Sequence, residues 1–183
     1  GSAEHPTLPL GELLAVLESR GAAAKAVLHL DGLALLDADP AALARLAGLA
    51  SMVKEAGALL GVLEPESLDM GPVAEAARSM AAGPVRVDVD VVKGLDGGLD
   101  AQRLERELVG ALASRGIAVS PRAASAVKAY VTDDVVVVGL VMAVYRRSVL
   151  RLSSRSKPYR HSGELNPVMS RALVNLARTR EGS

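Results

Sequence analysis

Residues 126–145 read AVKAYVT-DD-VVVVGLVMAVY, and this stretch decides the fold class. Two runs rich in valine flank Asp133-Asp134, which predicts a β-hairpin with its turn at the two aspartates. The second run, 135–145, is apolar at consecutive positions and therefore predicts a strand covered on both faces, at the centre of a sheet. It is too short to span a membrane as a helix, which needs about 20 apolar residues.

Upstream of this hairpin, the sequence predicts one further strand and a helix. Residues 85–91 alternate valine with charged side chains, the period-two pattern of a half-buried strand. Asp100 then supplies a helix N-cap, and Leu104, Leu108 and Leu112 follow on one helical face. This second half of the chain therefore has a strand–helix–strand–strand pattern.

Downstream of the hairpin, residues 146–160 are basic and predicted to be irregular, and Asn166-Pro167 opens a last helix. Its spacing predicts an inward and an outward face. We expect Val168, Met169, Leu173 and Leu176 to point inward, and Arg171, Asn175 and Arg178 to point outward.

The first half of the chain predicts a small α+β unit. A leucine-faced helix, 10–17, precedes a hairpin turned at Asp31-Gly32, and Asp39-Pro40 caps a second helix. Residues 52–63 are interpreted as a second hairpin broken at Ala56-Gly57, and a last helix follows Gly71-Pro72. We place a domain boundary at Gly83-Pro84, where the pattern changes.

The composition excludes several classes of protein. The chain has 183 residues, half of them apolar, which suits one large or two small folded domains and excludes disorder. It has no cysteine, so disulfides and thiolate metal sites are excluded. We expect a soluble, cytoplasmic protein.

The net charge of zero hides an asymmetry. Residues 1–84 carry five basic and eleven acidic side chains, whereas residues 85–183 carry sixteen basic and ten acidic ones. From Ala143 onward, nine basic residues face only Glu164 and Glu181. A local field of that sign attracts polyanions, although a single run of charge is more often a solvated face.

Three patterns mimic functional sites, and for each the structural interpretation is favoured. Residues 94–98 fit neither dinucleotide nor P-loop spacing, so an ordinary loop is expected. Asp88 and Asp90 share one side of a strand, which fits its wet face better than a hydrolytic carboxylate pair. The histidines lack metal-binding spacing, so we predict no metal site; they are His5, His29 and His161.

The group of residues that favours a function is a run of cations over residues 146–160, with Tyr145 before it and Tyr159 near its end. We predict phosphate contacts from Arg146, Arg147, Arg151, Arg155, Lys157 and Arg160, with Arg171 and Arg178 extending the same surface. For His161, a phosphate or ribose contact and a structural role are equally supported. Aromatic residues make up only 2% of the chain, which disfavours single-strand binders that stack bases. We therefore expect contact with the backbone of a folded RNA.

Residues 155–167, RSKPYRHSGELNP, followed by SRALVNLAR at 170–178, resemble the THUMP domain of tRNA guanine N2-methyltransferases of the archaeal type, which modify the guanosine at position ten. The resemblance covers about a seventh of the chain. Departures from the family pattern are Arg160, Ser162 and Ser170.

The resemblance implies an α+β chain with a ferredoxin-like domain at 3–83 and a THUMP domain at 84–183. It implies binding to the acceptor end of tRNA, as the recognition half of an AdoMet-dependent methyltransferase. No catalytic residue is expected in this chain, which has neither a glycine-rich AdoMet loop nor an (N/D)PP(Y/F) motif. S-adenosylmethionine is expected only for a catalytic domain absent here.

Two alternatives stay open. The chain could be a stand-alone THUMP adaptor that delivers tRNA to a separate enzyme such as an acetyltransferase, rather than a piece cut before a methyltransferase domain. It could also be a protein-interaction domain with a solvated basic edge. Whichever holds, we hypothesise that the acidic first half repels RNA, so that reversing Glu12, Glu18, Asp37 and Glu55 to lysine raises non-specific binding.

Overall fold

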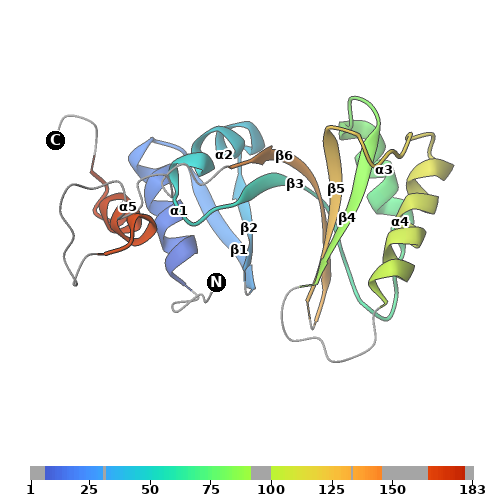
Figure 1. Cartoon of the computed structure of the whole chain (residues 1–183), viewed down its shortest axis with the longest axis horizontal. Coiled ribbons are helices and arrows are strands. Elements are labelled where there is room, and N and C mark those ends of the chain that lie inside the picture. The colour runs from blue at the N-terminus through green and yellow to red at the C-terminus, as the bar shows by residue number, and fades with distance from the viewer. Residues whose placement is uncertain (1–6, 31, 92–99, 133, 146–164, 180–183) are drawn as a thin grey trace. The chain divides into compact units, whose positions relative to one another are not determined.

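The computed structural model describes residues 7–30, 32–91, 100–132, 134–145 and 165–179 and has an α+β fold (Figure 1). This confirms the fold class predicted from the sequence. In chain order, the elements are α1 Leu8–Ser19, β1 Ala24–Leu30, β2 Leu33–Ala38, α2 Pro40–Leu46, the 3-10 turn η1 Ala47–Leu49, β3 Glu55–Leu63, α3 Met70–Met80, β4 Val85–Val91, α4 Ala101–Ser114, β5 Ser125–Val131, β6 Val136–Val144 and α5 Pro167–Leu176.

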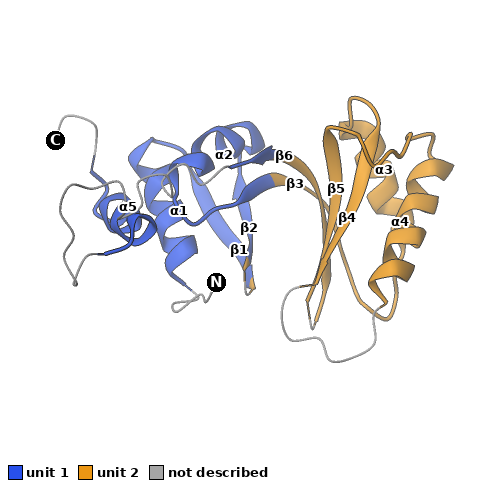
Figure 2. Cartoon of the chain, viewed as in Figure 1, with its two compact units in different colours: residues 1–29, 33–56, 143–183 blue, residues 30–32, 57–142 orange. Residues whose placement is uncertain are grey.

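The chain forms two compact units that interleave in sequence (Figure 2). Unit 1 comprises residues 1–29, 33–56 and 143–183, and unit 2 comprises residues 30–32 and 57–142. The division passes through β3 and β6. The boundary predicted at Gly83-Pro84 falls inside unit 2, and the assignment of two sequential domains, 3–83 and 84–183, stays a prediction.

A four-stranded sheet has the order β3-β6-β5-β4. β4 pairs with β5 in parallel, Val87 opposite Val127, and β5 pairs with β6 antiparallel, Ala129 opposite Val138. The mixed sheet places β6 in an interior position, as its apolar sequence predicts. The strand is buried from Val136 to Val138, whereas Met142 and Val144 near its end are exposed, so the predicted cover on both faces holds only for its first part. β1 and β2 form a separate two-stranded sheet, which confirms the first hairpin.

The second predicted hairpin is wrong, because residues 55–63 form the single strand β3. Gly57 does not turn the chain. A Cβ atom at this position would collide with the carbonyl oxygen of Leu140 on β6. The glycine therefore marks a close approach of two backbones, which a sequence pattern does not distinguish from a turn.

The helices α2, α4 and α5 begin where the predicted caps stand. The side chain of Asp39 accepts hydrogen bonds from Ala41 N and Ala42 N, that of Asp100 from Gln102 N, and that of Asn166 from Met169 N. Each bond satisfies an amide that the first turn of a helix leaves without a partner. Among the described residues, no helix is long and apolar enough to cross a membrane.

Each unit has its own apolar core. In unit 2, α3 and α4 pack against the sheet, and Leu104, Leu108 and Leu112 are fully buried among valines of β4, β5 and β6. In unit 1, Leu13, Val16 and Leu17 of α1 pack on η1 and the residue after it, and the ring of Tyr145 lies against this cluster. The leucine face predicted after Asp100 is confirmed. The face predicted for the helix 10–17 is confirmed in part, because Leu13 and Leu17 are buried whereas Leu10 and Leu14 are only partly buried.

Candidate nucleic-acid interface

Most of the predicted phosphate-binding residues lie outside the described residues. They are Arg146, Arg147, Arg151, Arg155, Lys157, Arg160 and His161. The structure does describe the residues on either side of the basic segment, which we define as residues 146–164. Tyr145 precedes it and Leu165 follows it, and both belong to unit 1.

Tyr145 makes three contacts within unit 1, through its backbone N, its phenol Oη and its ring. Its backbone N donates to Lys54 O at 2.7 Å, and its phenol Oη donates to Ala44 O at 2.5 Å. Its ring lies against Gly48, where a Cβ atom would come within 2.7 Å of Tyr145 Cδ1. Partial burial raises the pKa of the Tyr145 phenol. The chain therefore enters the basic segment from a fixed residue.

The helix α5, which follows the segment, has a buried face that differs in part from the one predicted. Ala172 is fully buried, whereas Leu173 is 48% and Val174 is 54% exposed. Asn175, predicted to point outward, donates from Nδ2 to Glu12 Oε1 at 2.7 Å and to Leu49 O at 3.1 Å. The predicted face is therefore correct in part: Val168, Met169 and Leu176 are partly buried and Arg171 is exposed, whereas Leu173 and Asn175 differ from the prediction.

Arg171 and Arg178 do not form the predicted row on one helix. Arg171 is exposed on α5. Arg178 lies beyond the end of α5, in the left-handed region at φ 54°, and its Nε donates to Glu18 Oε2 at 2.6 Å. Glu18 offsets part of the positive charge of Arg178. Of these two arginines, Arg171 is therefore the better candidate for a contact with a phosphate. Their role in RNA binding stays a prediction.

Glu12 is the polar residue that sequence reasoning missed. Its carboxylate is wholly buried and accepts from Ser51 N at 2.7 Å, Ser51 Oγ at 2.8 Å and Met52 N at 3.1 Å, besides Asn175. The only signal in the sequence is that Glu12 falls within the buried face of α1, next to Leu13. It is not part of an acidic surface, so its place among the residues proposed to repel RNA is wrong.

The paired carboxylates of β4 behave as the wet side of a strand. Asp88 Oδ2 accepts from Arg86 Nε at 3.0 Å, and Asp90 Oδ2 lies 2.7 Å from Lys128 Nζ on β5. Each aspartate therefore has its own cation, and the pair is not poised to share a proton or a water. Among the described residues, no cluster of three or more metal-binding side chains occurs.

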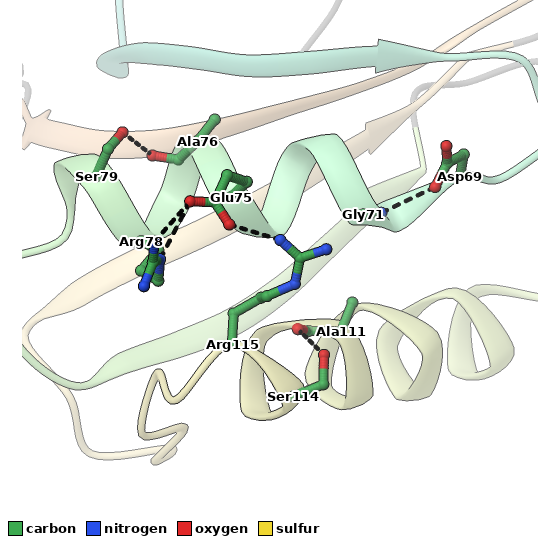
Figure 3. A network of polar contacts seen from close by, with 9 residues as sticks. All are labelled: Asp69, Gly71, Glu75, Ala76, Arg78, Ser79, Ala111, Ser114 and Arg115. Atoms are coloured by element: carbon green, nitrogen blue, oxygen red, sulfur yellow. Dashed lines mark hydrogen bonds and ion pairs between the residues drawn. The ribbon is translucent and has the colours of Figure 1, made fainter.

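Unit 2 presents a cation cluster that was not predicted, shown in Figure 3. Glu75 of α3 accepts from Arg78 Nη2 at 2.9 Å and from Arg115 Nη1 at 2.5 Å, so two arginines share one carboxylate. Their hydrogen bonds, that of Arg78 first, lower the pKa of Glu75. The cluster joins α3 to the end of α4. No local sequence pattern predicts it, because Glu75 and Arg115 lie 40 residues apart.

No family model matches the chain, and no curated protein matches it. Among solved structures, the fold is similar to the crystal structure of PH1313 from Pyrococcus horikoshii Ot3, with a TM-score of 0.54 and 9% sequence identity. The match covers 73% of this chain and 48% of that one, so the chain spans about half the length of PH1313. At this identity the likeness concerns the fold alone.

Proposed function

We propose that this chain is a THUMP-type module that binds tRNA at its acceptor end. The observation that carries the proposal is the charge of the basic segment. Its six arginines and lysines occupy residues 146–160 of a segment whose two flanking residues, Tyr145 and Leu165, belong to the same compact unit. A segment with this density of cations attracts the phosphates of a nucleic acid.

The scarcity of aromatic side chains supports a folded RNA over a single strand. Among the described residues, the aromatic side chains are Tyr130 and Tyr145. Tyr145 packs against Gly48 and the unit 1 core, and Lys128 Nζ lies 5.1 Å from the centre of the Tyr130 ring. Neither ring is an open stacking platform of the kind that unpaired bases use.

Within this proposal, the chain is the recognition half of an AdoMet-dependent tRNA (guanine-N2)-methyltransferase that acts in the cytoplasm. S-adenosylmethionine would then bind a catalytic domain outside this chain. An adaptor that delivers tRNA to a separate modifying enzyme is the second candidate. The reading frame beyond Ser183 distinguishes the two.

The experiment that tests the proposal compares two RNAs. We would measure binding of the chain to intact tRNA and to the same tRNA without its 3′ end, across a salt series. Recognition of the acceptor end predicts tighter binding to the intact tRNA at every salt concentration. Equal affinity for both RNAs would leave a non-specific cationic surface, and absence of binding at low salt would refute RNA recognition by this chain.

A further inference from the structure

The four-stranded sheet ends at β3, and this edge of the sheet is apolar and almost uncharged. Among the strands that the structure describes, only β6 lies beside β3. Residues 56–63 contain neither a charged side chain nor a proline. Ala58 and Leu60 are buried, whereas Leu59 is 50% and Val62 is 44% exposed. The outer edge of such a strand offers backbone N–H and C=O groups to a further strand.

The opposite edge of the same sheet is protected. The first residue of β4, Val85, exchanges two backbone hydrogen bonds with the chain at 118–120. Three charged residues then follow along β4: Arg86, Asp88 and Asp90. Charged side chains and a covering segment are the devices that prevent pairing at the edge of a natural sheet. Residues 57–63 of β3 have no such charge, so β3 is the edge of this sheet that suits a partner strand.

The sequence of β3 suits pairing with a second copy of itself. In an antiparallel pair whose two-fold axis passes through Leu59, Gly57 lies opposite Gly61 and Ala58 lies opposite Leu60. Glycine therefore faces glycine, and no charge faces a like charge. At the axis, Leu59 lies opposite its own copy, so each exposed leucine would cover the other.

We propose that this protein forms a symmetric dimer in which the β3 strands of two copies pair antiparallel about Leu59. The four-stranded sheets of the two copies then continue into one another. The inference goes beyond RNA binding and does not depend on it, since it uses unit 2 alone. Pairing between two single strands buries a small area, and interfaces below about 1,200 Å² belong to weak complexes. We therefore expect monomers in dilute solution and dimers at high protein concentration.

Analytical ultracentrifugation over a concentration series tests the dimer. Leu59→Lys would place two like charges directly opposite each other, and we expect it to weaken self-association about tenfold. The matched control is Val91→Lys, because Val91 is 49% exposed and ends the strand at the protected edge. This control should dimerise within about twofold of the wild type. Circular dichroism should show that both variants are folded, since neither side chain is buried.

Two results of this experiment would overturn the proposal. The first is a wild-type protein that stays monomeric at about 500 µM, well above the range in which weak complexes form. The second is a Leu59→Lys variant that associates as tightly as the Val91→Lys control, because another surface would then join the two copies.

A mixture of charge variants tests whether Leu59 faces its own copy. Leu59→Lys and Leu59→Glu should each associate weakly alone, because like charges then meet at the axis. An equimolar mixture should restore the dimer, since opposite charges would face each other. A mixture that associates no better than either variant alone would overturn the pairing about Leu59.

Disulfide trapping gives a second test of the same register. The chain has no cysteine, so Leu59→Cys introduces a single thiol. Residues directly opposite each other in an antiparallel pair have their Cα atoms within disulfide range. Mild oxidation should therefore crosslink Leu59→Cys into a covalent dimer and leave most of Val91→Cys monomeric. Equal crosslinking of the two variants would contradict pairing through β3.

Discussion

Gly48→Ala is the substitution for which the structure makes the sharpest stability prediction. The new methyl group would stand 2.7 Å from Tyr145 Cδ1 and 3.0 Å from Cε1, distances that Cβ atoms do not adopt. The ring must move, and it cannot move freely because its Oη donates to Ala44 O and its backbone N donates to Lys54 O.

The magnitude follows from these two constraints. Overpacking a filled site is destabilising by about 1–3 kcal/mol, and loss of the phenol hydrogen bond adds about 1 kcal/mol. We therefore expect Gly48→Ala to lower the free energy of unfolding by about 2–4 kcal/mol. Tyr145→Phe, which removes only the hydroxyl group, should lower it by about 1 kcal/mol.

Urea denaturation followed by circular dichroism measures both effects. The matched control is Gly110→Ala in α4, where an added Cβ meets no atom within 4 Å and higher helix propensity should stabilise by up to about 1 kcal/mol. A double variant, Gly48→Ala with Tyr145→Ala, should lose less than the sum of its parts because the clash is gone. If Gly48→Ala is as well tolerated as Gly110→Ala, the anchoring of Tyr145 described above is wrong.

Three other predictions address unit 1. Gly11→Ala should stabilise α1 by up to about 1 kcal/mol without undocking α5, because its Cβ would stand at normal contact distance from Leu176, and thermal denaturation checks this. Since burial raises the pKa of Tyr145 in the folded chain, its contribution to stability is complete below the ordinary tyrosine pKa of about 10 and is lost as the pH rises through the higher folded value. The pH dependence of unfolding in that alkaline range should therefore be weaker in Tyr145→Phe, and an unaltered slope would contradict it. Asp37→Lys, at an exposed residue of β2, should fold normally and raise non-specific RNA binding in a filter assay, whereas Glu12→Lys should unfold unit 1.

The elements that local chemistry determines were predictable from the sequence. The helix caps are Asp39, Asp100 and Asn166. They were predictable because a short polar side chain directly before an apolar helical pattern accepts hydrogen bonds from the amides of the first turn. The valine run of β6 could only be buried on both faces, and it occupies an interior place in the sheet.

What the sequence did not predict depends on contacts between distant residues. Gly57 was interpreted as a turn because only the tertiary approach of Leu140 explains it. Asn175 of α5 was assigned to the outward face because its partner, Glu12, lies 163 residues earlier. The basic segment was recognised by composition and resemblance alone, and seven of its predicted contact residues fall outside the described residues.

The measurement that tests the central claim most directly is the salt dependence of tRNA binding in two triple variants. Arg155→Ala/Lys157→Ala/Arg160→Ala neutralises the basic segment, and Arg78→Ala/Arg103→Ala/Arg106→Ala removes three cations, 60–76% exposed, from α3 and α4. Counterion release predicts that the first variant binds weakly and loses about 2–3 from the slope of log K against log salt, while the second stays near wild type. Equal losses in the two variants would contradict the account, because binding would then follow total charge and not the basic segment.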